Sequence, residues 1–477
     1  MNHKLITNLT PIIRLYRGSH SSRKGKYVLL FLFFLGISSC TDFIDVDPPQ
    51  NTLIAATVFE EATTVESALA NIYAKMRDQS MVSGNYGVSA LMGIYSDELD
   101  YYLFEPNYSE VYQHTLMASN TLISSWWNQA YSIIYAANDI LKGVENSHTL
   151  AAEDRARFKG QALFVRAYMH SLLVNLYGEV PYIKTTSYLE NNKVSRQTVP
   201  SVYAAIIADL TQAVLLLDTV DPSGERVVPN QHAAQALLAR MYLYTEDWEK
   251  AEATATKVIN NIAFESDIEK VFLKKASGTL WQLKPNGVTN RNTYEANQFV
   301  IRLIPGQLYA LNTALLDAFE PGDLRRSKWI GSKSSSDGLV TLHFAHKYKA
   351  IFNETSSLEY SILFRLAEQY LIRAEARAHA VNILGAQQDL NVIRHRAGLA
   401  NTTAANKDAL LAAILQERFV EFFTEQGHRW FDLKRMGKAK EVLGSIKTNW
   451  KDTDLLLPLP ETELELNPNL KPQNLGY

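Results

Sequence analysis

Two histidines and a pair of neighbouring carboxylates are the first residues in this 477-residue chain that could carry out chemistry. His343 and His346 form the sequence H-F-A-H inside a segment expected to be a strand. Residues three apart on a strand face opposite sides of the sheet, so a shared metal ion is not expected there. Asp97 and Glu98 could serve a glycosidase, which needs two facing acids several ångström apart. Adjacent side chains diverge, however, so this pair does not predict hydrolysis.

No short catalytic motif accompanies these residues. The sequence contains no G-x-S-x-G elbow, no phosphate-binding P-loop, no G-x-G-x-x-G and no H-E-x-x-H. A formal net charge of −3 gives no basic excess for nucleic-acid binding, and a single Cys excludes an internal disulfide and a cysteine-rich metal cluster. We therefore expect no enzyme, no cofactor, no metal and no nucleic-acid partner.

The one cysteine, Cys40, lies at the end of an N-terminal targeting segment. Residues 23–26 read R-K-G-K and precede the apolar run 27–37, which is too short to span a bilayer comfortably. The sequence I-S-S-C at the end of this run resembles a bacterial lipobox, in which the Cys thiol is acylated and cleavage makes it the new N-terminus. Residues 1–39 are then a lipoprotein signal peptide, and the acidic residues 40–56 are an extended tether. An ordinary secretory signal with an incidental Cys is the alternative.

Removal of the predicted signal peptide changes the net charge of the protein. Residues 1–39 hold six basic residues and no acid, so 41 basic and 50 acidic residues remain. The predicted mature chain is therefore acidic, with a formal charge of −9.

From residue 57 onward the chain reads as helices joined by short turns, because apolar residues recur at three- and four-residue steps. Strand signals are few, with 279–284 and 340–347 the best candidates, and the Ser/Gly/Lys-rich segment 327–338 reads as a mobile loop. The predicted helices are 57–77, 125–146, 151–177, 200–217, 230–244, 248–260, 358–381, 386–396, 408–425 and 429–436.

Several of these helix pairs share the layout of tetratricopeptide (TPR) repeats. In 236–253 the first helix closes on Tyr244, a tight polar turn follows, and the second helix opens with alanines that allow close approach. A similar plan appears in 370–396. Because the copies are divergent and interrupted, we predict a mainly α fold, a TPR-like helical superhelix with long loops and a few short strands.

Two stretches rich in aromatic or charged residues are interpreted as structural. Trp126 and Trp127 are expected in the helix core rather than in a ligand platform. The charged residues of 417–435 are expected to form an internal network of Arg and carboxylate groups, because buried charges need partners and this stretch supplies both signs.

In their joint order, these blocks resemble the SusD/RagB family of Bacteroidetes outer-membrane lipoproteins, over nearly the whole length. The blocks include W-W-N-Q-A-Y at 126–131, G-Q-A-L-F-V-R-A-Y at 160–168, N-V-I-R-H-R-A-G-L at 391–399, G-H-R-W-F-D-L-K-R at 427–435 and L-P-L-P at 457–460. The resemblance implies a SusD-like fold with an N-terminal helical region, 57–270, and a C-terminal SusD/RagB region, 271–477, packed as one globular body.

Sugar recognition combines flat aromatic faces with polar groups that satisfy hydroxyls, and the informative aromatic residues lie in loops that interrupt the scaffold. Two segments qualify, 97–108 and 284–294, and the family's ligand contacts come from loops in these same regions. The candidate ligand-binding residues are Tyr101, Tyr102, Tyr108, Asn290, Arg291, Asn292 and Tyr294. Ordinary loop packing is the alternative for each tyrosine.

The resemblance also implies a role. Such proteins face outward from the outer membrane beside a SusC-like TonB-dependent barrel, bind a nutrient, usually an oligosaccharide, and act as a lid without covalent chemistry. A RagB-like peptide binder and a helical scaffold without a ligand are the alternatives. A peptide site would need an exposed sheet edge or a charged groove, whereas the first segment offers Tyr rings and acids, which mildly favours neutral sugar.

Overall fold

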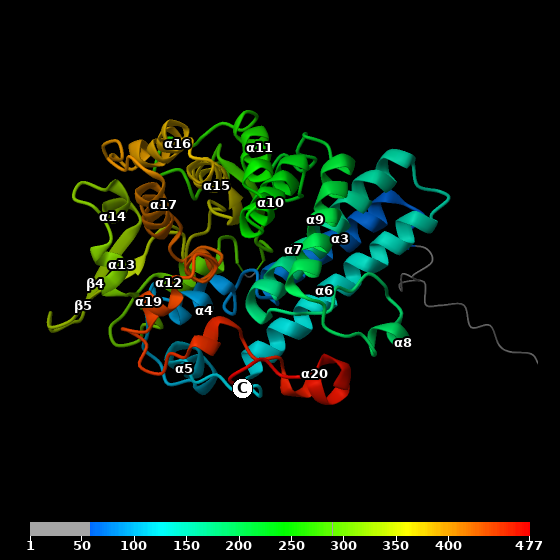
Figure 1. Cartoon of the computed structure of the whole chain (residues 1–477), viewed down its shortest axis with the longest axis horizontal. Helices are drawn as coiled ribbons and strands as arrows, with labels where there is room; N and C mark the ends of the chain where they lie inside the picture. The colour runs from blue at the N-terminus through cyan, green and yellow to red at the C-terminus, as the bar shows by residue number, and fades with distance from the viewer. Residues whose placement is uncertain (1–57, 289) are drawn as a thin grey trace, which may run out of the picture. The chain divides into compact units, whose positions relative to one another are not determined.

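The computed structural model describes residues 58–288 and 290–477, and helices dominate this part of the chain (Figure 1). Cys40 and the predicted signal peptide and tether lie outside the described residues. The longer helices are α3 (Ala62–Asp78), α4 (Val88–Tyr95), α5 (Pro106–Gln113), α6 (Thr121–Asn146), α7 (Ala152–Tyr177), α9 (Val199–Leu216), α10 (Gln231–Tyr244), α11 (Trp248–Ile259), α15 (Leu366–His379), α16 (Ile383–Arg396), α17 (Lys407–Phe422) and α18 (His428–Arg435). The shorter ones are α8 (Tyr188–Asn191), α12 (Tyr294–Phe299), α13 (Thr313–Asp317), α14 (Leu324–Lys328), α19 (Ala439–Leu443) and α20 (Glu461–Leu466), with 3₁₀ turns at Asp452–Leu455 and Pro468–Leu470.

Several helices begin at a side chain that satisfies otherwise unpaired backbone N–H groups. Asn120, Asn230, Asp247 and Asn406 cap α6, α10, α11 and α17 in this way. Such caps, together with the apolar periodicity, explain why the predicted helix limits lie close to the observed ones.

Consecutive helices pack against one another, in the order α6, α7, α9, α10, α11, α15 and α16. Small residues let α10, α11 and α15 approach closely, because Ala239, Ala251, Ala255 and Ala376 share one buried cluster. This is the contact expected of TPR-like pairs. Among the described helices, α9 is long and apolar enough to cross a membrane by length and composition, yet it packs on α7 and α10 as part of the folded body.

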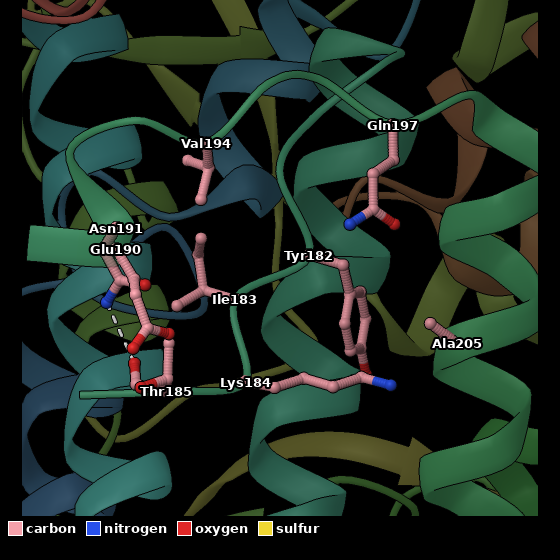
Figure 2. Close-up of a pocket in the computed structure, with 9 residues that line it drawn as sticks. All are labelled: Tyr182, Ile183, Lys184, Thr185, Glu190, Asn191, Val194, Gln197 and Ala205. Carbon is pink, nitrogen blue, oxygen red and sulfur yellow. Dashed lines mark hydrogen bonds between the residues drawn. The ribbon is translucent and has the colours of Figure 1, made fainter. Parts of the chain in front are cut away.

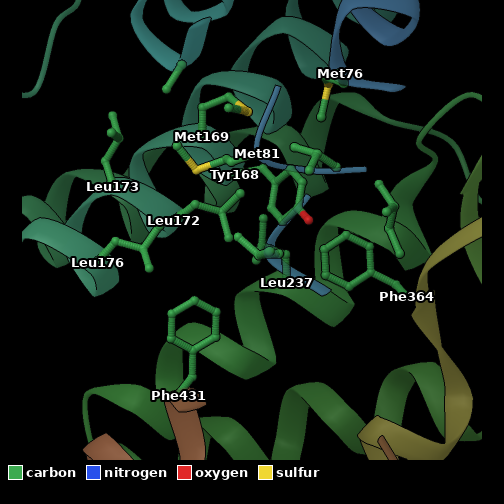
Figure 3. Close-up of a cluster of buried hydrophobic side chains, with 14 of the residues drawn as sticks. Met76, Met81, Tyr168, Met169, Leu172, Leu173, Leu176, Leu237, Phe364 and Phe431 are labelled. Carbon is green, nitrogen blue, oxygen red and sulfur yellow. The ribbon is translucent and has the colours of Figure 1, made fainter. Parts of the chain in front are cut away.

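The main core lies where α7 meets α10 and the strands β2 (Thr279–Leu283) and β6 (Ser361–Arg365) (Figure 3). The rings of Tyr168 and Phe364 lie 5.4 Å apart in an edge-to-face contact, and Trp281 packs against both. Trp126 and Trp127 are 1% and 3% exposed, which confirms that they belong to the helix core.

Three antiparallel two-stranded sheets occur in the described chain. They pair β1 (Leu99–Tyr101) with β3 (Tyr309–Leu311), β2 (Thr279–Leu283) with β6 (Ser361–Arg365), and β4 (Ile330–Ser334) with β5 (Thr341–Ala345). The strands predicted at 279–284 and 340–347 are confirmed as β2 and β5.

Two predicted elements are wrong in part. The helix expected from residue 358 starts at Leu366, and β6 precedes it; all five residues of β6 are buried, so the strand shows no alternating pattern to separate it from a buried helix. The loop expected over 327–338 contains β4, whose Ser/Gly/Lys composition hides a strand that is supported by pairing with β5.

The charged stretch near the C-terminus forms the buried network that the sequence predicts. Arg418 contacts Asp432 at 2.6 Å, and Arg429 donates two hydrogen bonds to Asp97 at 2.7 and 2.6 Å. All four side chains are buried, so these pairs hold α17 and α18 to the segment that follows α4.

Candidate ligand-binding site

Five tyrosines from four segments gather at β1 and α5, and we term them the tyrosine cluster: Tyr86, Tyr101, Tyr108, Tyr112 and Tyr309. The rings of Tyr101 and Tyr108 are stacked, with centroids 5.7 Å apart and planes 17° apart. Tyr309 lies 5.9 Å from Tyr101, and Tyr86 lies 6.5 Å from Tyr108. Tyr86 is 51% exposed and Tyr309 only 3%, so the cluster runs from a buried base to an open rim.

Strand pairing and a helix cap place the first three of the predicted tyrosines. Tyr101 lies opposite Tyr309 in the β1–β3 ladder, and the N–H of Tyr102 donates to the carbonyl of Leu308 at 3.0 Å. Tyr102 is 38% exposed at the rim. The N–H of Tyr108 donates to the Glu105 carboxylate at 2.9 Å, which starts α5 and fixes this ring.

Tyr86 is held by contacts to its backbone, which leave its ring free to face solvent. The indole Nε1 of Trp126 donates to the carbonyl of Tyr86 at 2.7 Å, and Gln298 donates to the carbonyl of Asn85 at 3.0 Å. Gly84, at φ +81°, supplies the left-handed turn before this pair, a conformation that favours glycine. The exposed ring therefore sits on a fixed backbone.

The hydroxyl groups of Tyr108 and Tyr112 stay protonated at neutral pH. Burial raises the pKa of Tyr108 and raises that of Tyr112 to about 12, with Asp100 adding to the rise at Tyr112. The Asp100 carboxylate accepts hydrogen bonds from Tyr112 at 3.1 Å and from Asn312 at 2.8 Å. The cluster thus presents ring faces and neutral hydroxyls, a combination that suits the C–H faces and hydroxyl edges of sugars.

The two asparagines predicted in the second segment are used to hold their loop. Asn292 is 2% exposed; its amide nitrogen donates to the carbonyl of Ser356 at 2.9 Å, and its oxygen accepts from the N–H groups of Leu358 and Glu359 at 2.8 and 3.0 Å. The oxygen of Asn290, 7% exposed, accepts from the N–H of Asn292 at 3.2 Å. These side chains therefore face the protein.

Arg291 and Tyr294 lie on the outer side of the same loop. The exposed Arg291 donates to the carbonyl of Thr355. Tyr294 is the first residue of α12 and is half-buried; burial first, and then the nearby Asp78 at the end of α3, raises its pKa. Among the described residues, no ring contact joins Tyr294 to the tyrosine cluster.

The structure thus brings Tyr101 and Tyr108 together and sets Tyr102 beside them, whereas the second segment contributes no ring to this group. Tyr86, Tyr112 and Tyr309 were not predicted. Tyr86 carried a usable signal, since an aromatic residue between two glycines in G-N-Y-G marks an exposed turn. Tyr309 carried none, because it reaches the site through pairing with a strand some 200 residues earlier.

Asp97 and Glu98 directly precede β1 and are buried in separate contacts rather than facing each other across a cleft. Asp97 is paired with Arg429, and Glu98 is 1% exposed, with one carboxylate oxygen accepting from the N–H of Thr424 at 3.2 Å. Burial, with Asp97 adding to it, raises the pKa of Glu98 to about 8. Within residues 58–288 and 290–477, no group of three or more His, Cys, Asp or Glu side chains is arranged to hold a metal ion.

Two family models match this chain. Residues 42–243 match a family described as starch-binding and associating with the outer membrane, and residues 327–477 match the SusD family. Together the matches take in both the helical N-terminal part and the charged C-terminal part.

Individual proteins are similar over nearly the full length. A SusD-like protein, P2, of Formosa agariphila is 26% identical over 95% of this chain and all of its own, and one from Bacteroides ovatus is 22% identical over 86% of this chain. A solved SusD superfamily structure from Bacteroides vulgatus covers 88% of this chain at a TM-score of 0.78 and 20% identity. A laminarin-binding SusD-like protein covers 87% at a TM-score of 0.74 and 21% identity, and these likenesses confirm the predicted fold.

Proposed function

Because this chain belongs to the SusD/RagB family, we propose that it captures an oligosaccharide at the tyrosine cluster and delivers it to a SusC-like TonB-dependent barrel. SusD-like proteins are carbohydrate-binding and non-catalytic, which confirms the prediction that the chain is not an enzyme. Membership also makes it an outer-membrane-associated protein.

The tyrosine cluster is the observation that carries the proposal. A sugar ring could lie against the exposed face of Tyr86 or Tyr102, while the hydroxyl groups of neighbouring tyrosines meet its hydroxyls. The Asp100 carboxylate beside the cluster is already engaged by Tyr112 and Asn312. The exposed Glu105 carboxylate accepts hydrogen bonds from the N–H of Tyr108 and from Asn107. A neutral glycan suits this chemistry better than a charged peptide terminus does, and the laminarin-binding relative is consistent with a glycan ligand.

Membrane attachment and partner complete the proposal. Acylation of Cys40 would anchor the protein, with residues 41–56 as a tether that lets the body face the cell exterior above its barrel. Cys40→Ser should therefore release the protein from the membrane fraction, whereas Cys40→Ser protein that stays membrane-bound would contradict the anchor.

The ligand class is tested by calorimetric titration of residues 41–477, since the compact unit starts at residue 55. The titrants are a polysaccharide panel and a peptide digest. We expect heat from at least one glycan. Binding of peptides without binding of any glycan would contradict the proposal in favour of RagB-like peptide binding. Binding of neither would favour a scaffold without a ligand.

The site is tested separately from the ligand class. Tyr101→Ala removes a stacked ring of the cluster, whereas Tyr294→Ala removes a ring outside it. We expect the first to weaken glycan binding more than the second. If both variants keep the wild-type affinity, the tyrosine cluster is not the site even though the chain binds glycan.

A further inference from the structure

A polar groove lies between α6, α7 and the segment that follows α7, far from the tyrosine cluster. Trp126 of α6 bonds to the cluster, and Lys142 of the groove lies 16 residues further along the same helix, about 24 Å at 1.5 Å per residue. The groove consists of two hollows of about 570 and 320 Å³, volumes in the range of small-ligand pockets. The hollows meet at Lys184, Thr185 and Glu190.

The floor of the groove is a fixed polar network. The buried Arg166 donates two hydrogen bonds to Asp209 at 2.7 and 2.8 Å, and the Tyr182 hydroxyl donates to the same carboxylate at 2.5 Å. Asn138 accepts from Arg166 at 2.8 Å and donates to the carbonyl of Ile183 at 3.0 Å. These bonds tie residues 182–183 to α6, α7 and α9, so the wall that carries Lys184 is preorganised.

His170 reinforces this wall without adding charge. Its ring stacks on Tyr182 at 3.9 Å, and its Nε2 accepts from the N–H of Ile183 at 3.2 Å. Burial lowers the pKa of His170 to about 3, so the ring stays neutral. The charge of the floor is thus confined to the Arg166–Asp209 pair, which balances itself.

Three lysines from different segments line the larger hollow: Lys142 of α6, Lys159 of α7 and Lys184. Lys159 lies 3.5 Å from Glu145, whereas neither Lys142 nor Lys184 has an ion-pair partner within the described chain. Figure 2 shows Lys184 extending beneath the Tyr182 ring, from whose centroid its Nζ lies 5.5 Å away. The hollow is also lined by the acids Glu145 and Glu190. Unpaired lysines around it still stand out in a predicted mature chain, residues 40–477, that carries 50 acidic and 41 basic residues.

The rim supplies groups for hydroxyls as well as for an anion. Asn191 donates to the carbonyl of Thr185 at 2.9 Å (Figure 2), and its buried side-chain oxygen has no hydrogen-bond partner among the described residues. Thr186 and Ser187 line the larger hollow and offer hydroxyl groups to a ligand there. A ligand that satisfies both the lysines and these groups carries a negative charge and several hydroxyls.

We propose that this lysine groove is a second saccharide site, which takes a sugar unit bearing a carboxylate or sulfate group. The choice of a saccharide rests on the proposed function; the negative charge rests on the lysines. Binding here would hold a charged stretch of a glycan while a neutral stretch, or another chain, occupies the tyrosine cluster.

The test titrates residues 41–477 with three tetrasaccharides: tetragalacturonate, a sulfated κ-carrageenan tetrasaccharide and neutral maltotetraose. We expect an anionic probe to bind, and Lys142→Ala and Lys184→Ala each to weaken it about fivefold to tenfold. Lys184→Arg should keep most of the affinity, and Lys257→Ala, which removes an exposed lysine of α11, should keep all of it. Whichever anionic probe binds identifies carboxylate or sulfate as the recognised group.

Four outcomes would overturn the lysine groove. Wild-type affinity in both Lys→Ala variants, whose folding is checked by thermal unfolding, excludes it. An anionic probe can also bind at the tyrosine cluster. In that case Tyr101→Ala abolishes its binding and the Lys→Ala variants bind it normally, so the proposed function stands and the groove is excluded. If none of the three probes binds but a glycan of the polysaccharide panel does, the groove alone is excluded. If no glycan of the panel binds either, both the groove and the proposed function are excluded.

Discussion

The tyrosine cluster and the charged network of α17 and α18 both join aromatic rings to polar groups, but they differ in where those groups point. In the network, Arg365 contacts Glu421 and Glu425, and its guanidinium lies 4.5 Å over the ring of Phe422. Every one of these groups is buried and paired. In the cluster, Tyr86 keeps a large exposed face, and Tyr102 at its rim is exposed as well. Composition alone does not separate a structural cluster from a binding surface, whereas burial and pairing do.

The largest expected effect lies in the buried network. Arg429→Ala leaves the 2% exposed carboxylate of Asp97 without its two charge-assisted bonds, so we expect a loss of about 3–5 kcal/mol in the free energy of unfolding. Lys440→Ala breaks an exposed pair with Asp452 and should leave stability unchanged. Urea unfolding of both variants measures the contrast, and equal losses would show that burial does not distinguish these pairs.

Substitution of Glu98, which lies between the two regions, is expected to have the second largest effect, a change in how stability depends on pH. Its pKa is raised from 4.5 to about 8 by burial, so from about pH 4.5 to about 8 the folded state holds a proton that the unfolded state releases. Stability should therefore fall as pH rises through this window, on the order of 1 kcal/mol per pH unit. Glu98→Gln stays neutral and should flatten this part of the profile. Parallel pH profiles of urea unfolding for the variant and the wild type would contradict the assignment.

Substitutions in the second segment, 284–294, are expected to have a smaller effect, on stability rather than on glycan binding. Asn292→Ala removes three hydrogen bonds that tie residues 356–359 to the loop, so we expect a loss of about 1–3 kcal/mol in stability and little change in glycan affinity. Arg291→Ala, in the same loop but exposed, serves as the control and should change stability less. If Asn292→Ala weakens glycan binding without changing stability, the amide is a ligand group after all.

The sequence predicted the long helices well because their apolar periodicity and side-chain caps are local signals. It predicted the buried role of Trp126 and of Arg429 because residues of that kind need a core or a partner. The site was only half predictable. Tyr101 and Tyr108 follow from an aromatic-rich segment between the longer helices, although they lie in β1 and α5 rather than in the expected loop. Tyr309 joins them through a three-residue strand pair that no local pattern predicts. The inward turn of Asn292 likewise depends on a segment more than 60 residues later.

Two tyrosines with the same exposure test the central claim most directly. Tyr86 belongs to the cluster and Tyr135 lies on α6 outside it, and each is 51% exposed. Calorimetric titration of Tyr86→Ala and Tyr135→Ala with the tightest-binding glycan of the panel compares them at nearly constant stability. We predict that Tyr86→Ala weakens binding about tenfold, or ~1.4 kcal/mol, and that Tyr135→Ala matches the wild type. Equal affinities for both variants would contradict the assignment of the tyrosine cluster as the glycan site.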